Sequence, residues 1–304
     1  MQNSQSTTYV LTADIGGSHI TAAVCHLEAK TIVPQSLVRH ELSSKASAEI
    51  ILGIWENACL SAAATVPQPI SAMGLAMPGP FDYENGISLI KGLNKYEALY
   101  QMDIKTRLAT LLKLEPALVK FRNDAEATIA GETLAGAGKG YQNVMGITLG
   151  TGFGSAQFKG GTSHDLNLGA LPFKQSIVDD NLSTRWFLRR YGELTGLTAV
   201  GVKELTLLAD GNETVRRIFK EFAVNMGEVL APTIESLKPD VLVICGNIAK
   251  ASHLFLPYLK KQFVSTNIKL AVLGENAALI GAAGLFDKTD TSLADNAKTI
   301  TNLI

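Results

Sequence analysis

The stretch TADIGGSH, residues 12–19, places one carboxylate and two glycines between two strand-like segments. Residues 9–14 (YVLTAD) and 20–27 (ITAAVCHL) are apolar and rich in β-branched side chains, which favours strands. The backbone N–H groups of a tight glycine turn form a concave anion site, and the missing side chains let phosphate oxygens approach closely. The stretch therefore predicts either an ordinary hairpin turn or a phosphate-binding turn.

The same pattern returns in the second half of the chain. A strand-like NVMGITL (143–149) is followed by the glycine-rich GTGFG (150–154) and then by SAQF (155–158). We call residues 16–18 the first glycine turn and residues 150–152 the second glycine turn. Two such turns, each between strands, predict two α/β halves built alike and favour phosphate binding over an ordinary hairpin.

Two standard nucleotide motifs do not fit these turns. A dinucleotide-binding fingerprint is followed by a helix, whereas GGSHITAAV (16–24) continues as a strand. A P-loop needs a serine or threonine after its lysine, and GAGKGY (136–141) lacks it. What remains is a β-hairpin phosphate clamp used twice.

A third polar element follows a predicted strand. Residues 117–121 (ALVKF) lead directly into RNDAEAT (122–128), where Asn123 or Asp124 begins a helix. An Asx side chain at that position satisfies free backbone N–H groups, so the plain interpretation is a helix N-cap. Between two phosphate turns, Asp124 is also a candidate base beside a transferable phosphoryl group.

Composition limits the class of protein. The 304 residues are 46% hydrophobic and 18% charged with a net charge of −1, which is typical of a soluble globular protein and argues against nucleic-acid binding. No window approaches the ~18 apolar residues of a membrane span, and the polar N-terminus does not resemble a signal peptide. Three isolated cysteines, Cys25, Cys59 and Cys245, suit a reducing cytoplasm and are expected in the core.

The remaining periodicity predicts two domains. We expect a small N-terminal α/β domain over residues 1–121, with a C-terminal helix near 288–304 as a candidate addition to it, and a larger α/β domain with the nucleotide site over 122–287. The further expected elements are helices over 47–66, 103–114, 214–237 and 276–286 and strands over 70–77 and 241–245.

With these elements in order, the chain resembles sugar kinases of the ROK family, within the larger actin-like fold. DIGGSH resembles the first phosphate loop DIGGTK, with Ser18 and His19 replacing threonine and lysine. Other blocks resemble the sugar-side, catalytic, second phosphate, adenosine and terminal-helix segments: MPGPFDYENG (77–86), NDAEATIAGE (123–132), TLGTGFGSA (148–156), VLVICGNIA (241–249) and NAALIGAAGLF (276–286). The resemblance spans residues 9–287 and implies a two-domain actin-like (ribonuclease H-like) ATPase fold with an interdomain cleft, and a homodimer.

The resemblance also implies an activity, the phosphorylation of a hexose or hexose derivative by ATP, as in glucokinase. Asp124 would be the general base for the primary hydroxyl, and Asp14 would act through water on Mg²⁺. Asn123 and the Gly79–Pro80 backbone would hold the sugar, with Asn94 either a further contact or a plain loop residue. The implied ATP-binding residues are Gly16, Gly17, Ser18, Gly150, Thr151, Gly152, Gly246 and Asn247; Asn247 is equally well interpreted as a helix cap.

One block departs from the family pattern. Family members carry a GEIGH block and a cysteine-rich zinc run, where this chain has LNLGALPFKQSIVDDNLSTRW (166–186). Asn167 stands in the position of a sugar-binding glutamate, Ala170 in that of the histidine, and Asp179 in that of a second glutamate. The cysteines are absent, so no structural zinc is expected, and Asn167 and Asp179 become the candidate sugar contacts.

Three other interpretations fit parts of the sequence. A sugar-responsive repressor needs a DNA-binding module, and only about eight residues precede the first strand. A catalytically weak or inactive sugar-binding regulatory protein is favoured by the altered block at 167–170 and disfavoured by Asp14, Asp124 and both glycine turns. The third interpretation is a kinase that acts on a substrate other than a sugar. We expect a cytoplasmic protein whose partners are a sugar and ATP, without nucleic acid or membrane.

Overall fold

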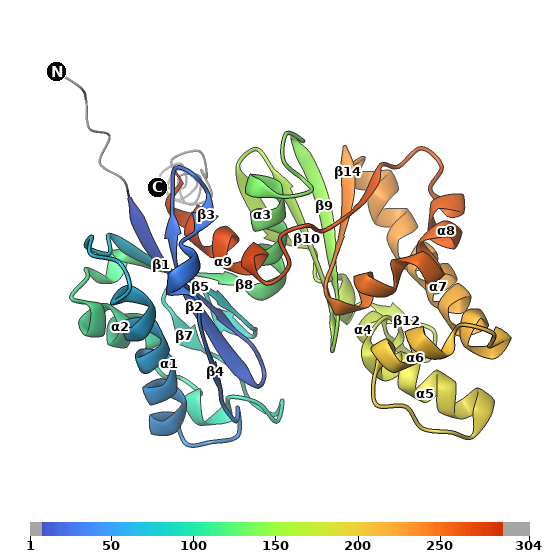
Figure 1. The fold of residues 1–304 in the computed structure, drawn as a ribbon, viewed down its shortest axis with the longest axis horizontal. Helices are drawn as coiled ribbons and strands as arrows, with labels where there is room; N and C mark the ends of the chain where they lie inside the picture. The colour runs from blue at the N-terminus through green and yellow to red at the C-terminus, as the bar shows by residue number, and fades with distance from the viewer. Residues whose placement is uncertain (1–7, 288–304) are drawn as a thin grey trace, which may run out of the picture. The chain divides into compact units, whose positions relative to one another are not determined.

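The computed structural model describes residues 8–287, which form two units of α/β structure (Figure 1). Within that range the first unit comprises residues 8–136 and 275–287, and the second comprises residues 137–274. These boundaries differ from the expected 1–121 and 122–287, and the helix expected near 288–304 lies outside the described residues.

The first unit is built on one mixed sheet with the strand order β3-β2-β1-β5-β8, and β4 also pairs with β2. β1 and β2 form an antiparallel hairpin around the first glycine turn, whereas β1, β5 and β8 run parallel. The strands are β1 (Tyr9–Ile15), β2 (His19–His26), β3 (Thr31–Ile32), β4 (Val38–Glu41), β5 (Ala72–Met77) and β8 (Val119–Asn123). The two strands predicted around DIGGSH are therefore confirmed.

Two helices of the first unit, α1 and α2, begin at polar caps that the sequence supplies. Ser47 accepts a hydrogen bond from the Ile50 N–H at the start of α1, and Asp103 accepts one from Thr106 at the start of α2. The elements are α1 (Ala48–Ala63), α2 (Ile104–Leu112), α3 (Asp124–Ala135) and α9 (Asn276–Ala283), with the small hairpin of β6 (Phe81–Asp82) and β7 (Ile87–Ser88) and 3-10 turns at Pro34–Ser36, Glu97–Leu99, Pro116–Leu118 and Gly284–Phe286.

Close packing between α3 and α9 explains why the unit boundaries differ from the prediction. A Cβ added at Gly131 would lie 1.9 Å from the carbonyl oxygen of Ala277, and one at Gly281 would lie 1.8 Å from that of Ala127. Only glycine permits such an approach of two helix backbones. α9 therefore packs against α3 in the first unit, although it follows the whole second unit in the chain (Figure 1).

The second unit repeats the opening of the first. Its sheet has the order β11-β10-β9-β14-β15, with an antiparallel β9–β10 hairpin around the second glycine turn and β14 parallel to β9. The strands are β9 (Asn143–Leu149), β10 (Phe153–Lys159), β11 (Thr162–Asp165), β14 (Val241–Cys245) and β15 (Ile268–Leu270). The prediction of two halves built alike is confirmed by the matching orders β2-β1-β5 and β10-β9-β14.

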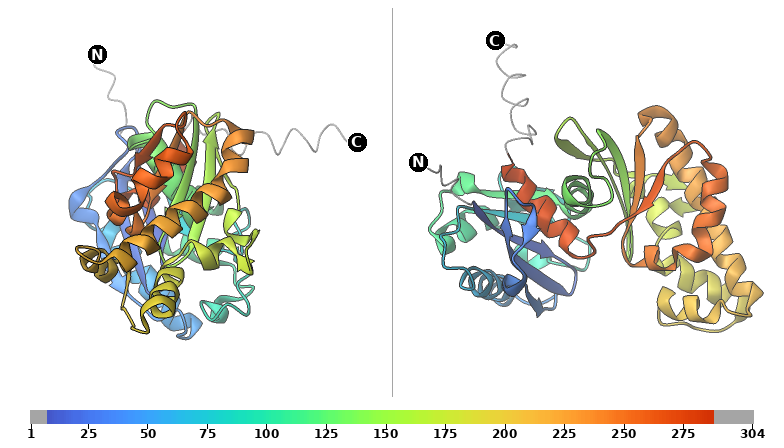
Figure 2. Two further views of the ribbon diagram at one scale, coloured as in Figure 1. Left: turned by 90° about the vertical axis from the view of Figure 1, so that its right-hand side faces the viewer. Right: turned by 45° about the horizontal axis from the view of Figure 1, so that its top comes forward.

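The helices of the second unit lie together on one side of its sheet, as the right-hand view of Figure 2 shows. An aromatic core joins α5 and α7, where the ring of Phe187 lies 4.9 Å from that of Phe219 and 4.6 Å from that of Phe222. The elements are α4 (Val178–Asn181), α5 (Thr184–Thr195), α6 (Val202–Leu208), α7 (Glu213–Leu237) and α8 (Ser252–Gln262), with the hairpin of β12 (Pro172–Phe173) and β13 (Ser176–Ile177) and 3-10 turns at Leu168–Ala170 and Asn247–Ala251.

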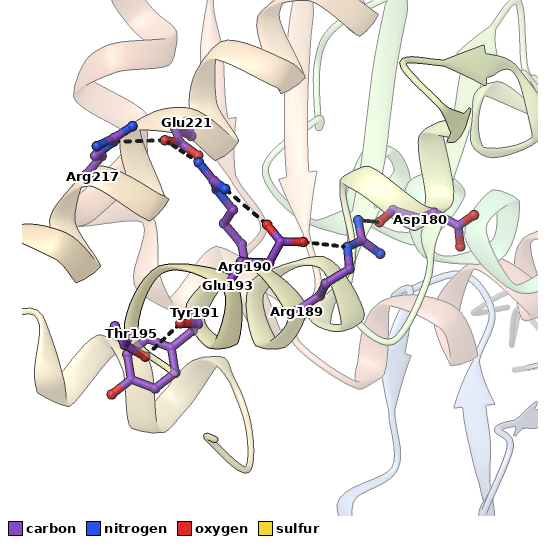
Figure 3. Close-up of polar contacts among 8 residues, drawn as sticks. All are labelled: Asp180, Arg189, Arg190, Tyr191, Glu193, Thr195, Arg217 and Glu221. Atoms are coloured by element: carbon purple, nitrogen blue, oxygen red, sulfur yellow. Dashed lines mark hydrogen bonds and ion pairs between the residues drawn. The ribbon is translucent and has the colours of Figure 1, made fainter. Parts of the chain in front are cut away.

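A chain of charged side chains runs over α7, α5 and α4 (Figure 3). Glu221 of α7 accepts hydrogen bonds from both Arg217 and Arg190, and Arg190 also pairs with Glu193. Arg189 extends the chain to the backbone oxygen of Asp180 at 3.1 Å. These contacts link α5 to α7 and to α4, and α5 begins at the second glycine turn.

The three cysteines are free and buried, as expected. No helix within residues 8–287 has the length and apolar character needed to cross a bilayer.

Candidate functional site

The first glycine turn is held from three sides. The Gly16 N–H donates to the His19 carbonyl over 2.9 Å, and the Leu42 N–H donates to the Ser18 carbonyl over 3.0 Å. The hydroxyl of Tyr96 donates to the Gly16 carbonyl. Tyr96 is fully buried, and burial together with the nearby Asp14 raises the pKa of its hydroxyl, which therefore stays protonated as a donor.

The outer part of this turn is open. Gly17 and Ser18 are exposed, and a Cβ at Gly17 would meet no atom within 4 Å. The imidazole of His19 lies over the turn, since a Cβ at Gly16 would come within 2.7 Å of its Cε1 atom. Burial, and then the charge of Arg39, lowers the pKa of His19 from 6.5, so the ring is neutral at pH 7.

Asp14 is the last residue but one of β1, just before the turn, and is half-buried. Its pKa rises from 3.8 to about 7, first because of burial and then because of the charges of Asp124 and Glu275, while Arg39 opposes the rise. The predicted metal-side carboxylate and the predicted base thus act on each other within the first unit.

Asp124 is the first residue of α3 and is exposed, with its Oδ1 atom accepting from the Ala125 N–H at 2.8 Å. Asn123 is the N-cap, because its Oδ1 atom accepts from the N–H groups of Ala125 and Glu126 at 2.9 and 3.3 Å. The capping interpretation is therefore confirmed for Asn123. Its amide nitrogen donates to the Tyr83 hydroxyl over 3.2 Å.

Tyr83 connects the remaining sugar-side candidates of the first unit. Its hydroxyl donates to the Met77 carbonyl over 3.1 Å, and a Cβ at Gly79 would lie 3.2 Å from that hydroxyl. The Gly79–Pro80 peptide is cis. The structure thus brings Gly79, Pro80 and Asn123 together around a tyrosine that sequence reasoning did not single out.

Asn94 lies in an exposed turn with a positive φ of 55°. Its N–H donates to the Glu97 carboxylate over 2.8 Å. This local contact agrees with the interpretation of Asn94 as a loop residue, and its role as a sugar contact stays a prediction.

The second glycine turn closes on itself, with the Gly150 N–H donating to the Gly152 carbonyl over 3.0 Å. Thr184, at the start of α5, donates through both its N–H and its hydroxyl to the Gly150 carbonyl, each over 2.9 Å. Arg185 donates to the Thr151 carbonyl over 3.3 Å. Sequence reasoning missed Thr184 and Arg185, which lie more than thirty residues from the turn that they hold.

The side chain of Asp179, a predicted sugar contact, reaches the same turn. Its carboxylate accepts from the Phe153 N–H over 2.5 Å and pairs with Arg185. Asn167 is exposed with a φ of 46°, and its N–H donates to Asp165 over 2.7 Å. The contacts of Asp179 thus organise the turn, and Asn167 lies in a short exposed bend.

The two candidate adenosine residues follow β14. Gly246 has a φ of 91°, and a Cβ there would lie 2.3 Å from the Leu149 carbonyl oxygen, so this glycine lies directly beside the second glycine turn. Asn247 begins the 3-10 turn, and its side chain accepts from the Lys250 ammonium over 2.8 Å. The N-cap position belongs to Gly246, so the interpretation of Asn247 as the cap is wrong.

The carboxylates of Asp14 and Asp124 fit a magnesium ion that has few protein ligands. Within residues 8–287 no three His, Cys, Asp or Glu side chains converge as metal ligands. Mg²⁺ is commonly bound by one or two carboxylates together with waters and substrate phosphates. Asp14 and Asp124 repel each other, and a divalent cation relieves such repulsion.

The fold and the two glycine turns define the class, which is the actin-like ATPase fold. The sequence model of the ROK family matches residues 10–169 and 174–289, and the chain belongs to the ROK family. The break at 170–173 falls within the block whose family residues are replaced here.

Curated relatives of the chain are sugar kinases. An N-acetyl-D-glucosamine kinase from Mannheimia succiniciproducens is 25% identical over 311 residues, covering 90% of this chain and 97% of the relative. A glucokinase from Thermotoga maritima is 25% identical over 252 residues, covering 70% of this chain and 78% of the relative. Among solved structures, a ROK family glucokinase from Streptomyces griseus in complex with glucose and AMPPNP superposes with a TM-score of 0.74 at 23% identity, covering 91% and 98% of the two chains. The predicted family and fold are confirmed.

Proposed function

We propose that this chain phosphorylates a hexose or hexose derivative at its primary hydroxyl with ATP as donor. The observation that carries the proposal is the placement of Asp124 and Asp14 in one electrostatic site beside the open first glycine turn. The sugar-kinase names of its relatives support the same activity.

Asp124 is the proposed general base. The N-terminus of α3 favours negative charge on its carboxylate, and the residue is exposed. Its Oδ1 atom accepts from the Ala125 N–H, which fixes one side of the carboxylate. In the reaction the carboxylate takes the proton of the sugar hydroxyl while that oxygen attacks the γ-phosphorus and ADP leaves.

Asp14 is the proposed metal-side carboxylate, holding Mg²⁺ through water. The bound ion would neutralise charge on the donor phosphates. Burial and the charges of Asp124 and Glu275 raise the pKa of Asp14. A divalent cation held there would favour the charged form of this carboxylate.

Each glycine turn is proposed to bind donor phosphates through backbone N–H groups. The anchors described above, Tyr96 for the first turn and Thr184 for the second, occupy turn carbonyl groups. Each turn therefore keeps its conformation without a ligand, which lowers the cost of ordering on binding. Gly246 and Asn247 are proposed to lie near the adenosine.

The sugar contacts are proposed to be the Gly79–Pro80 backbone, Asn94, Asn123, Asn167 and Asp179. Asn123 has its oxygen engaged at the cap and donates one amide N–H to Tyr83, so its other amide N–H is the group proposed to reach a sugar hydroxyl. Glucose and N-acetylglucosamine are the first substrates to test, because kinases of both sugars are relatives of this chain.

A sugar-binding protein with little turnover is the second candidate. The observation that favours it is the altered block: Asn167 and Ala170 are exposed, and the carboxylate of Asp179 is engaged with Phe153 and Arg185. A site rebuilt in this way would bind a sugar with fewer charged contacts than the family pattern provides.

A coupled assay of ADP release over glucose, N-acetylglucosamine, N-acetylmannosamine and mannose separates the two candidates. Turnover with one sugar that falls in Asp124→Asn supports the kinase. Calorimetric sugar binding without ADP release in the wild type supports the binding protein. Glu56→Gln, an exchange at a carboxylate of α1 that pairs with Arg107 in the same unit, is the matched control and should leave turnover unchanged.

A further inference from the structure

The first glycine turn carries no positive charge of its own. Its residues are Gly16, Gly17 and Ser18, and His19 follows at the position of the lysine in the pattern DIGGTK. The ring of His19 is neutral at pH 7 and lies over the turn. A turn that binds a triphosphate therefore needs a cation from elsewhere in the fold.

The register of the sheet places Arg39 on the same face as Asp14. Asp14 of β1 pairs with Thr21 of β2, and Thr21 in turn pairs with Arg39 of β4. Residues directly opposite each other in neighbouring strands project to the same face of a sheet. Arg39 thus projects from the same face as Asp14, two strands away, which is about 10 Å between Cα atoms and within reach of its long side chain.

A cavity joins this arginine to the glycine turn. It has a volume of about 500 Å³ and is lined by Ser18, His19, Arg39, Glu41, Leu42 and Ser43. The charge of Arg39 lowers the pKa of both Asp14 and His19, which places the guanidinium within electrostatic range of both ends of the turn. Glu41 is the one carboxylate in the lining and lies opposite His19 in the register.

The present partner of Arg39 is weakly held. Its Nη1 atom lies 3.1 Å from the Oε2 atom of Glu275, and the two side chains are 46% and 74% exposed. Exposed pairs of this kind contribute little stability, so exchange of the carboxylate for another anion costs little. A guanidinium binds phosphate oxygens through two parallel hydrogen bonds. We therefore expect Arg39 to bind a phosphate group in preference to the exposed carboxylate of Glu275.

We propose that Arg39 is the phosphate-binding cation of the first glycine turn, exchanging Glu275 for the phosphate chain of the nucleotide in the cavity beside Ser18. This inference rests on the proposed function, because it takes the turn to be the donor site. It assigns to β4 the charge that the turn itself lacks.

Calorimetric binding of AMPPNP with Mg²⁺ tests the proposal without requiring turnover. Arg39→Ala should weaken AMPPNP binding about tenfold or more and leave the binding of adenosine and of the sugar unchanged. Arg39→Lys should recover part of the loss, and Glu275→Gln should bind AMPPNP as tightly as the wild type or more tightly. The matched control is Arg107→Ala, which removes an arginine of α2 that pairs with Glu56 of α1.

AMPPNP affinity within twofold of the wild type in Arg39→Ala would overturn the proposal, as would equal losses for adenosine and AMPPNP. Unchanged sugar binding and melting temperature show that the variant is folded. A wild type that binds AMPPNP through Arg39 but phosphorylates no sugar would refute the proposed kinase activity and leave the phosphate contact standing. A wild type that binds no AMPPNP overturns both.

Discussion

Replacement of Asp14 by asparagine should stabilise the metal-free protein, and the gain should grow with pH. The pKa of Asp14 is about 7 in the folded state and 3.8 without the fold. Below pH 3.8 both states hold the proton and the carboxyl group has no effect. As the pH rises from 3.8 to 7 the unfolded state ionises first, so the wild type loses stability that the asparagine variant keeps.

The magnitude follows from the two pKa values. At 1.36 kcal/mol for each pKa unit, the expected gain in unfolding free energy is about 1.7 kcal/mol at pH 5 and about 4.3 kcal/mol at pH 8. Part of Asp14 stays accessible, so these figures are upper values. The gain of Asp14→Asn should therefore increase by about 2.6 kcal/mol between pH 5 and pH 8.

Urea unfolding at pH 5 and pH 8, in chelator and without nucleotide, measures this increase. Asp82→Asn is the control of opposite sign, because hydrogen bonds from Asn85 hold the pKa of Asp82 below its usual range and its loss should destabilise above pH 4. A gain for Asp14→Asn that is the same at both pH values would refute the burial argument. A variant less stable than the wild type at pH 8 would refute it more directly.

Three further predictions concern activity and packing. Asp124→Asn should keep sugar binding and lose about 10²–10⁴ in turnover, measured by ADP release; near-normal turnover would remove it from the role of base. Tyr96→Phe should cost about 1 kcal/mol of stability and weaken AMPPNP binding, because the Gly16 carbonyl loses its donor; denaturant melts and calorimetry check this, and an unaffected affinity would contradict it. Gly281→Ala should destabilise by more than about 3 kcal/mol because its Cβ would meet a backbone oxygen at 1.8 Å, whereas Gly53→Ala, in open space on α1, should stabilise slightly; similar melting temperatures for the two would contradict this.

The parts of the fold that could be predicted from the sequence are those that depend on residues close together in the chain. The strands around DIGGSH follow from β-branched runs and a glycine pair, and the cap at Asn123 follows from an Asx residue at the end of a strand. The two similar halves followed from repetition of one local pattern.

The parts that were missed depend on contacts between distant residues. Tyr96 lies 80 residues from the carbonyl that it holds, and Tyr83 lies 40 residues from Asn123. A buried tyrosine has no local signal that distinguishes an anchor from a core residue. The unit boundary was misplaced for the same kind of reason, since NAALIGAAGLF is small and apolar all round and does not indicate which half it packs on.

The late position of α9 in the chain has a consequence for biosynthesis. Residues 137–274 are translated before the helix that packs on the sheet of residues 8–136. The inserted unit has its own core and sheet and is able to fold first, while the earlier polypeptide still lacks the surface that contacts Gly74 and Gly131. Nascent chains truncated before residue 275 should therefore be more resistant to protease in residues 137–274 than in residues 8–136.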